Sequence, residues 1–331
     1  MKEKILKLDE KDKLILLALE TDARQSISSI AKKARLSQEI VSYRIKKYLK
    51  DEIITKFFII PNFDTLGFTT YRVYLQFLAT TPEKEQEILE YVRDKMPCQW
   101  VGFCDGRWDL MARISARDLF EFNCMMTDFF EKYAKYIKQK EITMQVRHTW
   151  WPSTYGLTET PPKKLLKHEI PTKVDVVKHD KIDLQILSVL SDDARTPTIE
   201  IAKKVGVSAD TVHYRIKRLI ENKVITQIKS YFNREKRNQQ HSQVFVRLYQ
   251  QPDRIKDLTD FLSRMPECFF IASMVGAWDM QFGIDSRNSG EFHEIFGLVK
   301  KNFSDVIIDY ETLIVYKEYS PNPFKYYIEK M

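Results

Sequence analysis

The hydrophobic residues near the amino terminus recur at the spacing of three short helices. We predict these helices over residues 9–20, 28–34 and 38–50, followed by a β-branched strand over residues 53–58 that would form part of a terminal hairpin, or wing. Ser28 or Ser26 is placed to cap the second helix, and Ser37 to cap the third. The second and third helices are separated by only about three residues, which is typical of a helix-turn-helix unit.

The same pattern returns 171 residues later. Residues 12–55 and 183–226 align without a gap, and 19 of the 44 paired positions are identical. In this second copy, Asp180 or Lys181 opens the first helix, Thr198 is expected to cap the second, and Ser208 the third, before a strand over residues 224–228. A period of this length indicates that a whole folding unit was duplicated.

On a helical wheel, the third helix of each copy has one hydrophobic face and one polar face. The hydrophobic face predicts core residues, namely Val41, Ile45, Tyr48 and Leu49 in the first copy and Val212, Ile216, Leu219 and Ile220 in the second. The polar face consists of Glu39, Ser42, Tyr43, Lys46, Lys47 and Lys50, matched by Asp210, His213, Tyr214, Lys217, Arg218 and Glu221.

Each of these units is followed by a strand-helix-strand-strand-helix-strand order. We predict strands over residues 69–80, 98–104, 108–115 and 142–151 with helices over 82–95 and 116–136, and then strands over 241–250, 268–274, 278–285 and 306–316 with helices over 252–264 and 289–302. This order is typical of a ferredoxin-like sandwich, in which two helices cover one face of four antiparallel strands. The aromatic and aliphatic richness of these segments predicts that the other face is covered by a partner.

The chain is therefore interpreted as α+β, with two copies of a winged helix-turn-helix followed by a ferredoxin-like domain. The expected domains are residues 1–60, 61–151, 179–232 and 233–331, and the proline- and lysine-containing segment 152–178 is expected to be an exposed linker. In a proline-stiffened form of about 3.1 Å per residue the linker could span roughly 80 Å, so the two α+β domains can pack against each other within one chain. We expect such an intramolecular pseudo-dimer, while pairing of each half with another chain, and further homo-oligomerisation, stay open.

Composition excludes several classes of protein. Apolar residues make up 44% of the chain and charged residues 30%, no apolar run reaches the roughly 18 residues that span a bilayer, and the charged start of the chain does not resemble a signal peptide, so we expect a cytoplasmic protein without a membrane partner. The six histidines are scattered singly, which predicts that there is no metal site. We also expect no cofactor. The cysteines form no CxxC pair and are expected to be buried, reduced thiols, at positions Cys98, Cys104, Cys124 and Cys268.

The net charge of +7 is concentrated in the duplicated helical units. Residues 1–56 carry +5 and residues 173–229 carry +3, so the rest of the chain is close to neutral. A basic excess confined to small units is typical of a surface that binds phosphates. With the third helix in a major groove, the base-reading candidates are Gln38, Ser42, Tyr43, Ala209, His213 and Tyr214. The phosphate-binding candidates are Lys46, Lys47, Lys50, Lys217 and Arg218, joined by Lys32, Lys33, Lys203 and Lys204 of the second helix.

Arg44 and Arg215 lie near the edge of the hydrophobic face, so an intramolecular ion pair, for example with Asp22 and Asp193, is as good an interpretation as DNA contact. The two copies keep the same inward residues but differ outward, for example Ser42 against His213. We therefore expect the two helix-turn-helix units, which we call the two heads, to read unlike half-sites of an imperfect palindrome.

Together, the halves resemble the Lrp/AsnC family of feast/famine regulatory proteins. The resemblance is carried by residues 30–37 and 41–45 of the helix-turn-helix, by Ile53-Ile54-Thr55, and by the Gly-x-x-Asp hairpins Gly106-Arg107-Trp108-Asp109 and Gly276-Ala277-Trp278-Asp279. It implies a transcriptional regulator that binds double-stranded DNA, whose ferredoxin-like (RAM) domains dimerise and, in many members, sense amino acids or related metabolites.

The same resemblance places a small-molecule effector between subunits, near the hairpins, so that Gly106, Asp109, Gly276 and Asp279 are the effector-binding candidates. Glycine permits a tight turn, and aspartate could accept a hydrogen bond from an α-amino group; the alternative is that both merely shape the hairpin. Two departures from the family pattern are expected, namely the fusion of two units and a first hairpin, from Gly102 to Asp109, that is three residues longer than the second.

Two other functions stay open. Some proteins of this architecture act on tetrapyrroles, as a siroheme decarboxylase does, and aromatic residues such as Trp100, Trp108, Trp150 and Trp151 could line a pocket. We nevertheless expect no enzyme and no catalytic residues, because no histidine has an evident acid-base partner and no nucleophile arrangement is present. The third interpretation is an architectural DNA-binding protein without an effector.

Overall fold

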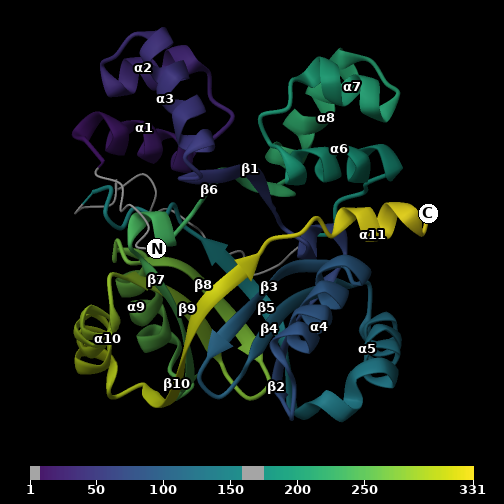
Figure 1. The fold of residues 1–331 in the computed structure, drawn as a ribbon, viewed down its shortest axis with the longest axis vertical. Helices are drawn as coiled ribbons and strands as arrows, with labels where there is room; N and C mark the ends of the chain where they lie inside the picture. Colours follow the sequence, from purple (N-terminus) through teal and green to yellow (C-terminus); the bar gives the residue numbers. More distant parts are fainter. Residues whose placement is uncertain (1–7, 159–174) are drawn as a thin grey trace. The chain divides into compact units, whose positions relative to one another are not determined.

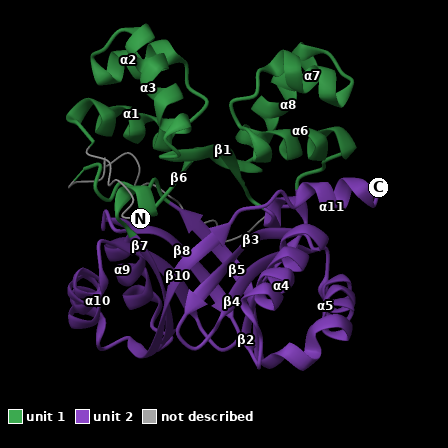
Figure 2. Cartoon of the chain, viewed as in Figure 1, with its two compact units in different colours: residues 1–62, 151–168, 177–239 green, residues 63–150, 169–176, 240–331 purple. Residues whose placement is uncertain are grey.

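The computed structural model describes residues 8–158 and 175–331, and the chain divides into two compact units (Figures 1 and 2). Unit 1 comprises residues 1–62, 151–168 and 177–239, and unit 2 comprises residues 63–150, 169–176 and 240–331. Each unit therefore combines corresponding segments of the two repeats. Within the predicted linker, residues 159–174 lie outside the described residues.

Unit 1 contains six helices in two sets of three among its described residues. They are α1 (Glu10–Thr21), α2 (Ile27–Ala34), α3 (Gln38–Lys50), α6 (Lys181–Asp192), α7 (Thr198–Val205) and α8 (Ala209–Glu221). The hydroxyls of Ser26, Ser37 and Ser208 accept hydrogen bonds from main-chain N–H groups at the starts of α2, α3 and α8, which confirms these predicted caps. The prediction for Thr198 is wrong, because Thr198 is the first helical residue and Pro197 precedes it without a side-chain cap.

The two strands predicted as wings pair with each other. β1 (Ile54–Pro61) and β6 (Ile225–Phe232) form a two-stranded antiparallel sheet in which Phe57 faces Ser230 and Ile59 faces Ile228. The expected terminal hairpin within each repeat is therefore wrong. A lone strand leaves its main-chain N–H and C=O groups unpaired, and here the equivalent strand of the other repeat satisfies them.

The hydrophobic face of each third helix is narrower than the helical wheel predicts. Val41, Ile45 and Tyr48 in α3 are buried, as are Val212, Ile216 and Leu219 in α8. Leu49 and Ile220, however, are 40% and 45% exposed, so their prediction as core residues is wrong. They lie at the margin of a face that three residues already fill.

A buried ion pair joins the two repeats inside unit 1. The Lys229 ammonium on β6 lies 2.6 Å from a carboxylate oxygen of Glu20 on α1, and the two side chains are 5% and 1% exposed. The same carboxylate accepts a hydrogen bond from the Ser153 main-chain N–H, and Lys229 also donates to the Trp151 carbonyl. Trp151, Pro152, Ser153 and Thr154 are consequently buried, so the expectation that the linker is exposed is wrong for its first residues.

Unit 2 contains two ferredoxin-like sets of elements, which confirms the predicted fold class. The first set is β2 (Thr69–Phe77), α4 (Pro82–Lys95), β3 (Cys98–Asp105), β4 (Leu110–Ala116), α5 (Leu119–Tyr133) and β5 (Ile137–Trp150). The second set is β7 (Gln240–Leu248), α9 (Pro252–Ser263), β8 (Cys268–Val275), β9 (Met280–Ser286), α10 (Ser289–Phe303) and β10 (Ile307–Tyr319). α11 (Phe324–Glu329), which the sequence pattern did not predict, follows the last strand. Short 3-10 turns lie at Asp64–Leu66, Ala134–Tyr136 and, in unit 1, Glu235–Arg237.

The eight strands of unit 2 close into a barrel in the order β10-β3-β4-β2-β5-β8-β9-β7. Within each repeat the pairing follows the ferredoxin pattern, and the two repeats join where β5 pairs with β8 and where β10 pairs with β3. Helices α4 and α5 lie on one side of the barrel and α9 and α10 on the other (Figure 1). The sheet face that we predicted to be covered therefore faces the other repeat.

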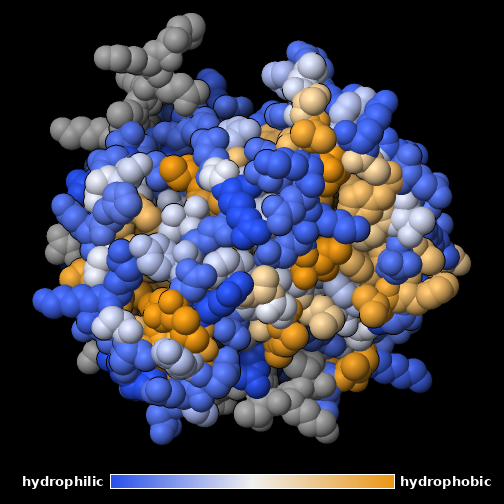
Figure 3. Space-filling view, turned by 90° about the horizontal axis from the view of Figure 1, so that it is seen from below, coloured by the Kyte–Doolittle hydropathy of each residue, from blue (hydrophilic) through white to orange (hydrophobic). Residues whose placement is uncertain are grey.

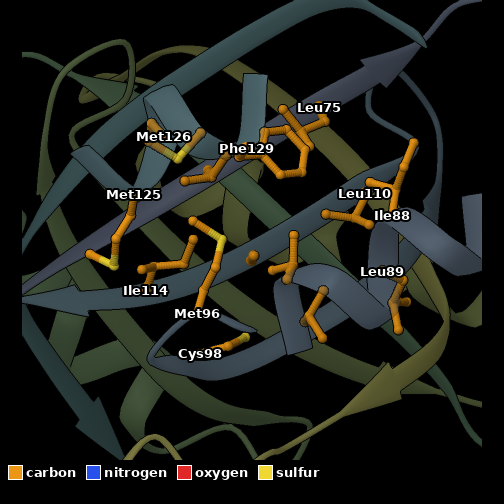
Figure 4. Close-up of a cluster of buried hydrophobic side chains, with 14 of the residues drawn as sticks. Leu75, Ile88, Leu89, Met96, Cys98, Leu110, Ile114, Met125, Met126 and Phe129 are labelled. Carbon is orange, nitrogen blue, oxygen red and sulfur yellow. The ribbon is translucent and has the colours of Figure 1, made fainter. Parts of the chain in front are cut away.

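Two hydrophobic clusters support this arrangement. One lies between the first sheet and its helices, where Ile88, Leu89, Met126 and Phe129 pack against strand residues such as Leu110 (Figure 4). The other lies inside the barrel and draws on both repeats; its members are Tyr74, Trp100, Cys104, Trp108, Met111, Phe245, Met274, Trp278, Leu313 and Val315. Because this second cluster needs residues of both repeats, neither sheet can bury its inner face alone.

Three further observations concern the cysteines, the hydrophobic surface and the length of the helices. Cys98, Cys104 and Cys268 are buried free thiols, but Cys124 is exposed on α5, so the prediction of its burial is wrong. Hydrophobic side chains reach the surface in several separate patches (Figure 3). No helix among the described residues is both long and apolar enough to cross a membrane.

Replacement of Lys229 by methionine should destabilise the protein by about 3–5 kcal/mol, because the buried Glu20 carboxylate would lose its cation. The double replacement Glu20→Leu with Lys229→Met should recover most of this loss, since no buried charge remains. Urea denaturation followed by circular dichroism measures both. The matched control is Lys217→Met, which breaks an ion pair with Glu221 whose side chains are 67% and 63% exposed. An equal loss of stability in Lys229→Met and Lys217→Met would contradict the assignment.

Candidate nucleic-acid interface

In each helix-turn-helix, the second helix ends at a residue in the left-handed conformation, which begins the turn to the third helix. Gly206 ends α7 with φ +77°, which glycine adopts without strain, whereas Arg35 ends α2 with φ +53°. Ser37 and Ser208 follow two residues later and begin the third helices. The turn predicted between residues 35–37 and 206–208 is thereby confirmed.

The outward face of α3 carries most of the predicted DNA-binding side chains. Five of them are exposed, namely Gln38, Tyr43, Lys46, Lys47 and Lys50. The Tyr43 side chain is 68% exposed, although a large aromatic side chain is more often buried. Ser42 is half-buried. The structure therefore places the candidates that belong to α3 along one side of that helix.

The equivalent face of α8 is less basic. His213, Tyr214 and Lys217 are exposed and Ala209 is half-buried, but Lys50 is replaced by Glu221, which lies 3.8 Å from the Lys217 ammonium. Arg218 donates to the buried carboxylate of Asp183 at 2.6 Å, so part of its guanidinium is already engaged within the protein. The lysines predicted on the second helices, Lys32, Lys33, Lys203 and Lys204, are all exposed.

Arg44 and Arg215 form intramolecular ion pairs, as one of the two interpretations predicted, but with other partners. Arg44 donates to Asp9 at 2.8 Å and to Asp12 at 2.5 Å, and Arg215 donates to Asp180 and Asp183 in the same way. The hydrogen bond to Asp9 raises the pKa of Arg44 above its ordinary value, although partial burial acts in the opposite direction. The expected partners Asp22 and Asp193 instead accept hydrogen bonds from main-chain N–H groups of Arg24 and Arg195, in the turn after the first helix.

Arg24 and Arg195 hold the two heads together, a role that we did not predict. Arg24 donates to the carbonyl oxygens of Ala194 and Thr196 across the repeats, and Arg195 donates reciprocally to the Ala23 carbonyl. The Ala23 N–H donates to Ile228 and the Ala194 N–H to Phe57, so each turn is also bonded to the other repeat's strand. The sequence signal was present in the run Asp-Ala-Arg, which both copies contain, but an identical run does not reveal that its members contact each other.

The Gly-x-x-Asp hairpins have the same length in both repeats, so the expected three-residue extension of the first hairpin is wrong. Gly106 and Gly276 follow strands of eight residues each and adopt φ +141° and φ +140°. An added Cβ atom at Gly106 would lie 2.5 Å from Leu313, and one at Gly276 would lie 2.9 Å from Thr143. Glycine is therefore required at both turns, by backbone conformation and by close packing on the other repeat.

The hairpin aspartates are bonded to the main chain. An Asp109 carboxylate oxygen accepts from the Phe77 N–H at 2.6 Å, and an Asp279 oxygen accepts from the Leu248 N–H at 2.8 Å. These bonds fix each hairpin to the strand beside it. The assignment of Gly106, Asp109, Gly276 and Asp279 to effector binding stays a prediction.

Comparison with known proteins agrees with these features. Residues 8–49 match the AsnC-type helix-turn-helix domain, and residues 179–226 match a winged helix-turn-helix DNA-binding family. An uncharacterized HTH-type transcriptional regulator of Pyrococcus furiosus is 32% identical over 110 residues, which cover 33% of this chain and 73% of that protein. Another, from Pyrococcus abyssi, is 30% identical over 139 residues, covering 42% and 87%.

The HTH-type transcriptional regulator FL11 of Pyrococcus furiosus is 29% identical over 120 residues, covering 36% of this chain and 79% of that protein. Among solved structures, the siroheme decarboxylase NirDL has a similar fold, with a TM-score of 0.61 and 13% identity over 97% of this chain and 98% of that one. At that identity the likeness concerns the fold alone. The two helix-turn-helix matches and the regulators of which this chain covers most of the length show that the protein belongs to the Lrp/AsnC family of transcriptional regulators, in a tandem-duplicated form.

Proposed function

We propose that this protein is a sequence-specific regulator in which one chain supplies both reading heads for one DNA duplex. The observation that carries the proposal is the joining of the two helix-turn-helix units in unit 1 through the β1–β6 sheet and the reciprocal Arg24 and Arg195 hydrogen bonds. Two single units would need to associate before binding a double site. The fused chain is a covalent pseudo-dimer, which forms both heads at once.

The separation of the two half-sites should be fixed. Heads on flexible tethers tolerate changes of spacing, but main-chain hydrogen bonds link each head directly to the strand of the other repeat. A pair of heads of this kind reads successive major grooves about 34 Å apart or a multiple of that distance. We infer that the operator is two half-sites at one permitted spacing.

The two half-sites should also differ in sequence and in their electrostatic contribution. α3 has four basic residues and one acidic residue, whereas α8 has three and two, and Arg218 is partly engaged by Asp183. The phosphate attraction is therefore stronger at the first head. Gln38 and Ser42, replaced by Ala209 and His213, give the heads different hydrogen-bonding groups for base edges.

An amino acid or related metabolite is proposed as effector at the hairpins that contain Gly106, Asp109, Gly276 and Asp279. What supports it is the tight glycine turn on each hairpin and the position of each hairpin against the other repeat. A ligand that binds there would contact both repeats. An architectural DNA-binding protein would have neither this response nor a preferred sequence.

A tetrapyrrole enzyme is the competing candidate, favoured by the full-length fold likeness to a siroheme decarboxylase. The curated relatives are instead named as transcriptional regulators. The two candidates differ in a simple observable, because a regulator should be isolated without pigment and should bind duplex DNA in a salt-dependent manner.

Selection from random duplexes should return two unlike half-sites at one spacing, since the outward residues of α3 and α8 differ and the heads are tied. Sequencing of the bound duplexes measures sequence, symmetry and spacing together. A perfectly symmetric consensus would contradict unlike reading by the two heads. Recovery of no consensus would contradict sequence-specific binding altogether.

The double variant Lys46→Gln with Lys47→Gln should lower the slope of log affinity against log salt by about 0.9 for each phosphate contact that is lost. Titration of a selected duplex at several salt concentrations measures this slope. The matched control is Lys95→Gln with Lys301→Gln, which removes two exposed charges from unit 2. If both double variants change the slope equally, α3 is not the phosphate-binding surface.

A further inference from the structure

Two arginines lie directly opposite each other inside the barrel of unit 2. In the antiparallel pairing of β2 with β4, Arg72 is the register partner of Arg113. Arg72 is 3% exposed, and Arg113 is half-buried. Like charges in directly opposed strand positions repel each other, so this placement weakens the sheet unless something compensates for it.

No carboxylate compensates Arg72 among the described residues. Its two terminal nitrogens donate to neutral amide oxygens, one to Gln281 and the other to Gln145 at 2.7 Å, and its Nε–H has no acceptor. Burial lowers the pKa of Arg72 to about 10, so the guanidinium is still charged at neutral pH. A buried cation without an anion is strongly unfavourable, and such groups are typical of functional sites.

His148 on β5 adds a second donor without an acceptor. Its Nδ1 lies 3.0 Å from an Arg113 nitrogen, and because arginine can only donate, Nδ1 must be the acceptor. The imidazole proton is therefore on Nε2, which is buried and has no partner among the residues that the structure describes. Burial first, and then Arg113 and Arg72, hold the pKa of His148 well below its usual value, so this ring is neutral.

Aromatic rings border the cluster. The Phe270 ring centroid lies 6.0 Å from the Arg72 guanidinium carbon and 5.2 Å from the His148 ring centroid. The Trp150 ring is tilted against the His148 ring at 4.9 Å and lies 5.5 Å from the Arg113 guanidinium carbon. Because Arg113, His148 and Trp150 are only half-buried, solvent reaches this side of the cluster. The surroundings combine hydrogen-bond donors and positive charge with flat apolar walls.

The second repeat lacks this arrangement. The positions of Arg72, Arg113 and His148 correspond to Gln243, Gly283 and Glu318, as the equivalent strand pairings show. There a Glu318 carboxylate oxygen accepts from the Trp100 indole N–H at 2.6 Å. The second repeat thus has an acceptor, Glu318, at the position where the first repeat has the unpaired donor of His148.

We propose that Arg72 and His148 bind the carboxylate of a small ligand inside the first repeat's half of the barrel. The carboxylate accepts from the Arg72 Nε–H and the His148 Nε2–H, and a planar apolar body of the ligand lies against Phe270 and Trp150. Only an anion resolves the charge of Arg72 and satisfies both donors. The proposal does not rest on DNA binding, and its donors, Arg72 and His148, are not residues of the hairpins.

The charge of the cluster selects among carboxylates. An α-ammonium group would be repelled by the buried Arg72 guanidinium, whose hydrogen-bond acceptors among the described residues are the neutral amides of Gln281 and Gln145. Acids without an amino group should therefore bind better than the corresponding amino acids. This preference distinguishes the site from the proposed amino-acid effector at the hairpins.

The test measures binding of phenylacetate and benzoate to the full chain by isothermal titration and by the midpoint of thermal unfolding. Both acids should bind at millimolar concentration and raise the midpoint. Benzamide should not, because it lacks the charge, and any binding of phenylalanine, whose ammonium group this site repels, should be the same in the Arg72→Gln protein. Absence of acid binding, or equal binding of benzamide, would overturn the proposal.

Two variants locate the site. Arg72→Gln should weaken acid binding by about tenfold to hundredfold, the loss expected for a hydrogen bond to a charged group, without lowering the unfolding midpoint of the free protein. His148→Phe, which keeps the ring and removes the donor, should weaken binding as well and serves if Arg72→Gln does not fold. Arg287→Gln, an exposed arginine of the second repeat, is the control and should bind as the original protein does. Unchanged binding in His148→Phe or in a folded Arg72→Gln protein would contradict the site.

Discussion

Main-chain pairing between the two repeats is the constraint on which the rest of this structure depends. β1 and β6 have no other strand partner among the described residues, and the two four-stranded sheets close only through β5 with β8 and β10 with β3. Unpaired strand edges are unfavourable and invite association, so each repeat completes the other. The interior cluster around Trp108 and Trp278 has the same requirement, because it takes residues from both sheets.

Because the two repeats are fused and differ in sequence, a polar group can be present in one repeat and absent from the other. A symmetric dimer of identical chains would contain every such group twice. The buried pair of Glu20 with Lys229 has Ser191 and Phe58 at the corresponding positions, and the donor cluster of Arg72 and His148 has Gln243 and Glu318. In a homodimer each such group would occur on both sides of the twofold axis. A single chain can keep the shared framework and place unpaired buried donors in one repeat, while the other repeat has different residues at the equivalent positions. The same freedom allows the outward residues of α3 and α8 to differ.

Sequence periodicity predicted the elements well and their long-range pairing poorly. Helices such as Pro82–Lys95 and Gln38–Lys50 were predicted to the residue, because caps and hydrophobic spacing are local signals. The partner of β1 was not predictable, since a β-branched run does not specify which strand satisfies its edge. Likewise, the aspartates that hold Arg44 were misassigned because Asp22 and Asp12 are equally plausible from spacing alone. Arg72 gave no signal at all in the sequence, because its importance arises from burial without a counter-ion.

The most direct test of intrachain pairing places one cysteine on each strand of the β1–β6 sheet. Lys56 and Tyr231 are register partners, so the variant Lys56→Cys with Tyr231→Cys, in a Cys124→Ser background, should form a disulfide on oxidation. Non-reducing electrophoresis should then show a chain of 39.3 kDa that migrates faster than its reduced form. A disulfide-linked band at about twice that mass, formed at the expense of the single chain, would show that the strands pair between chains and would contradict the account.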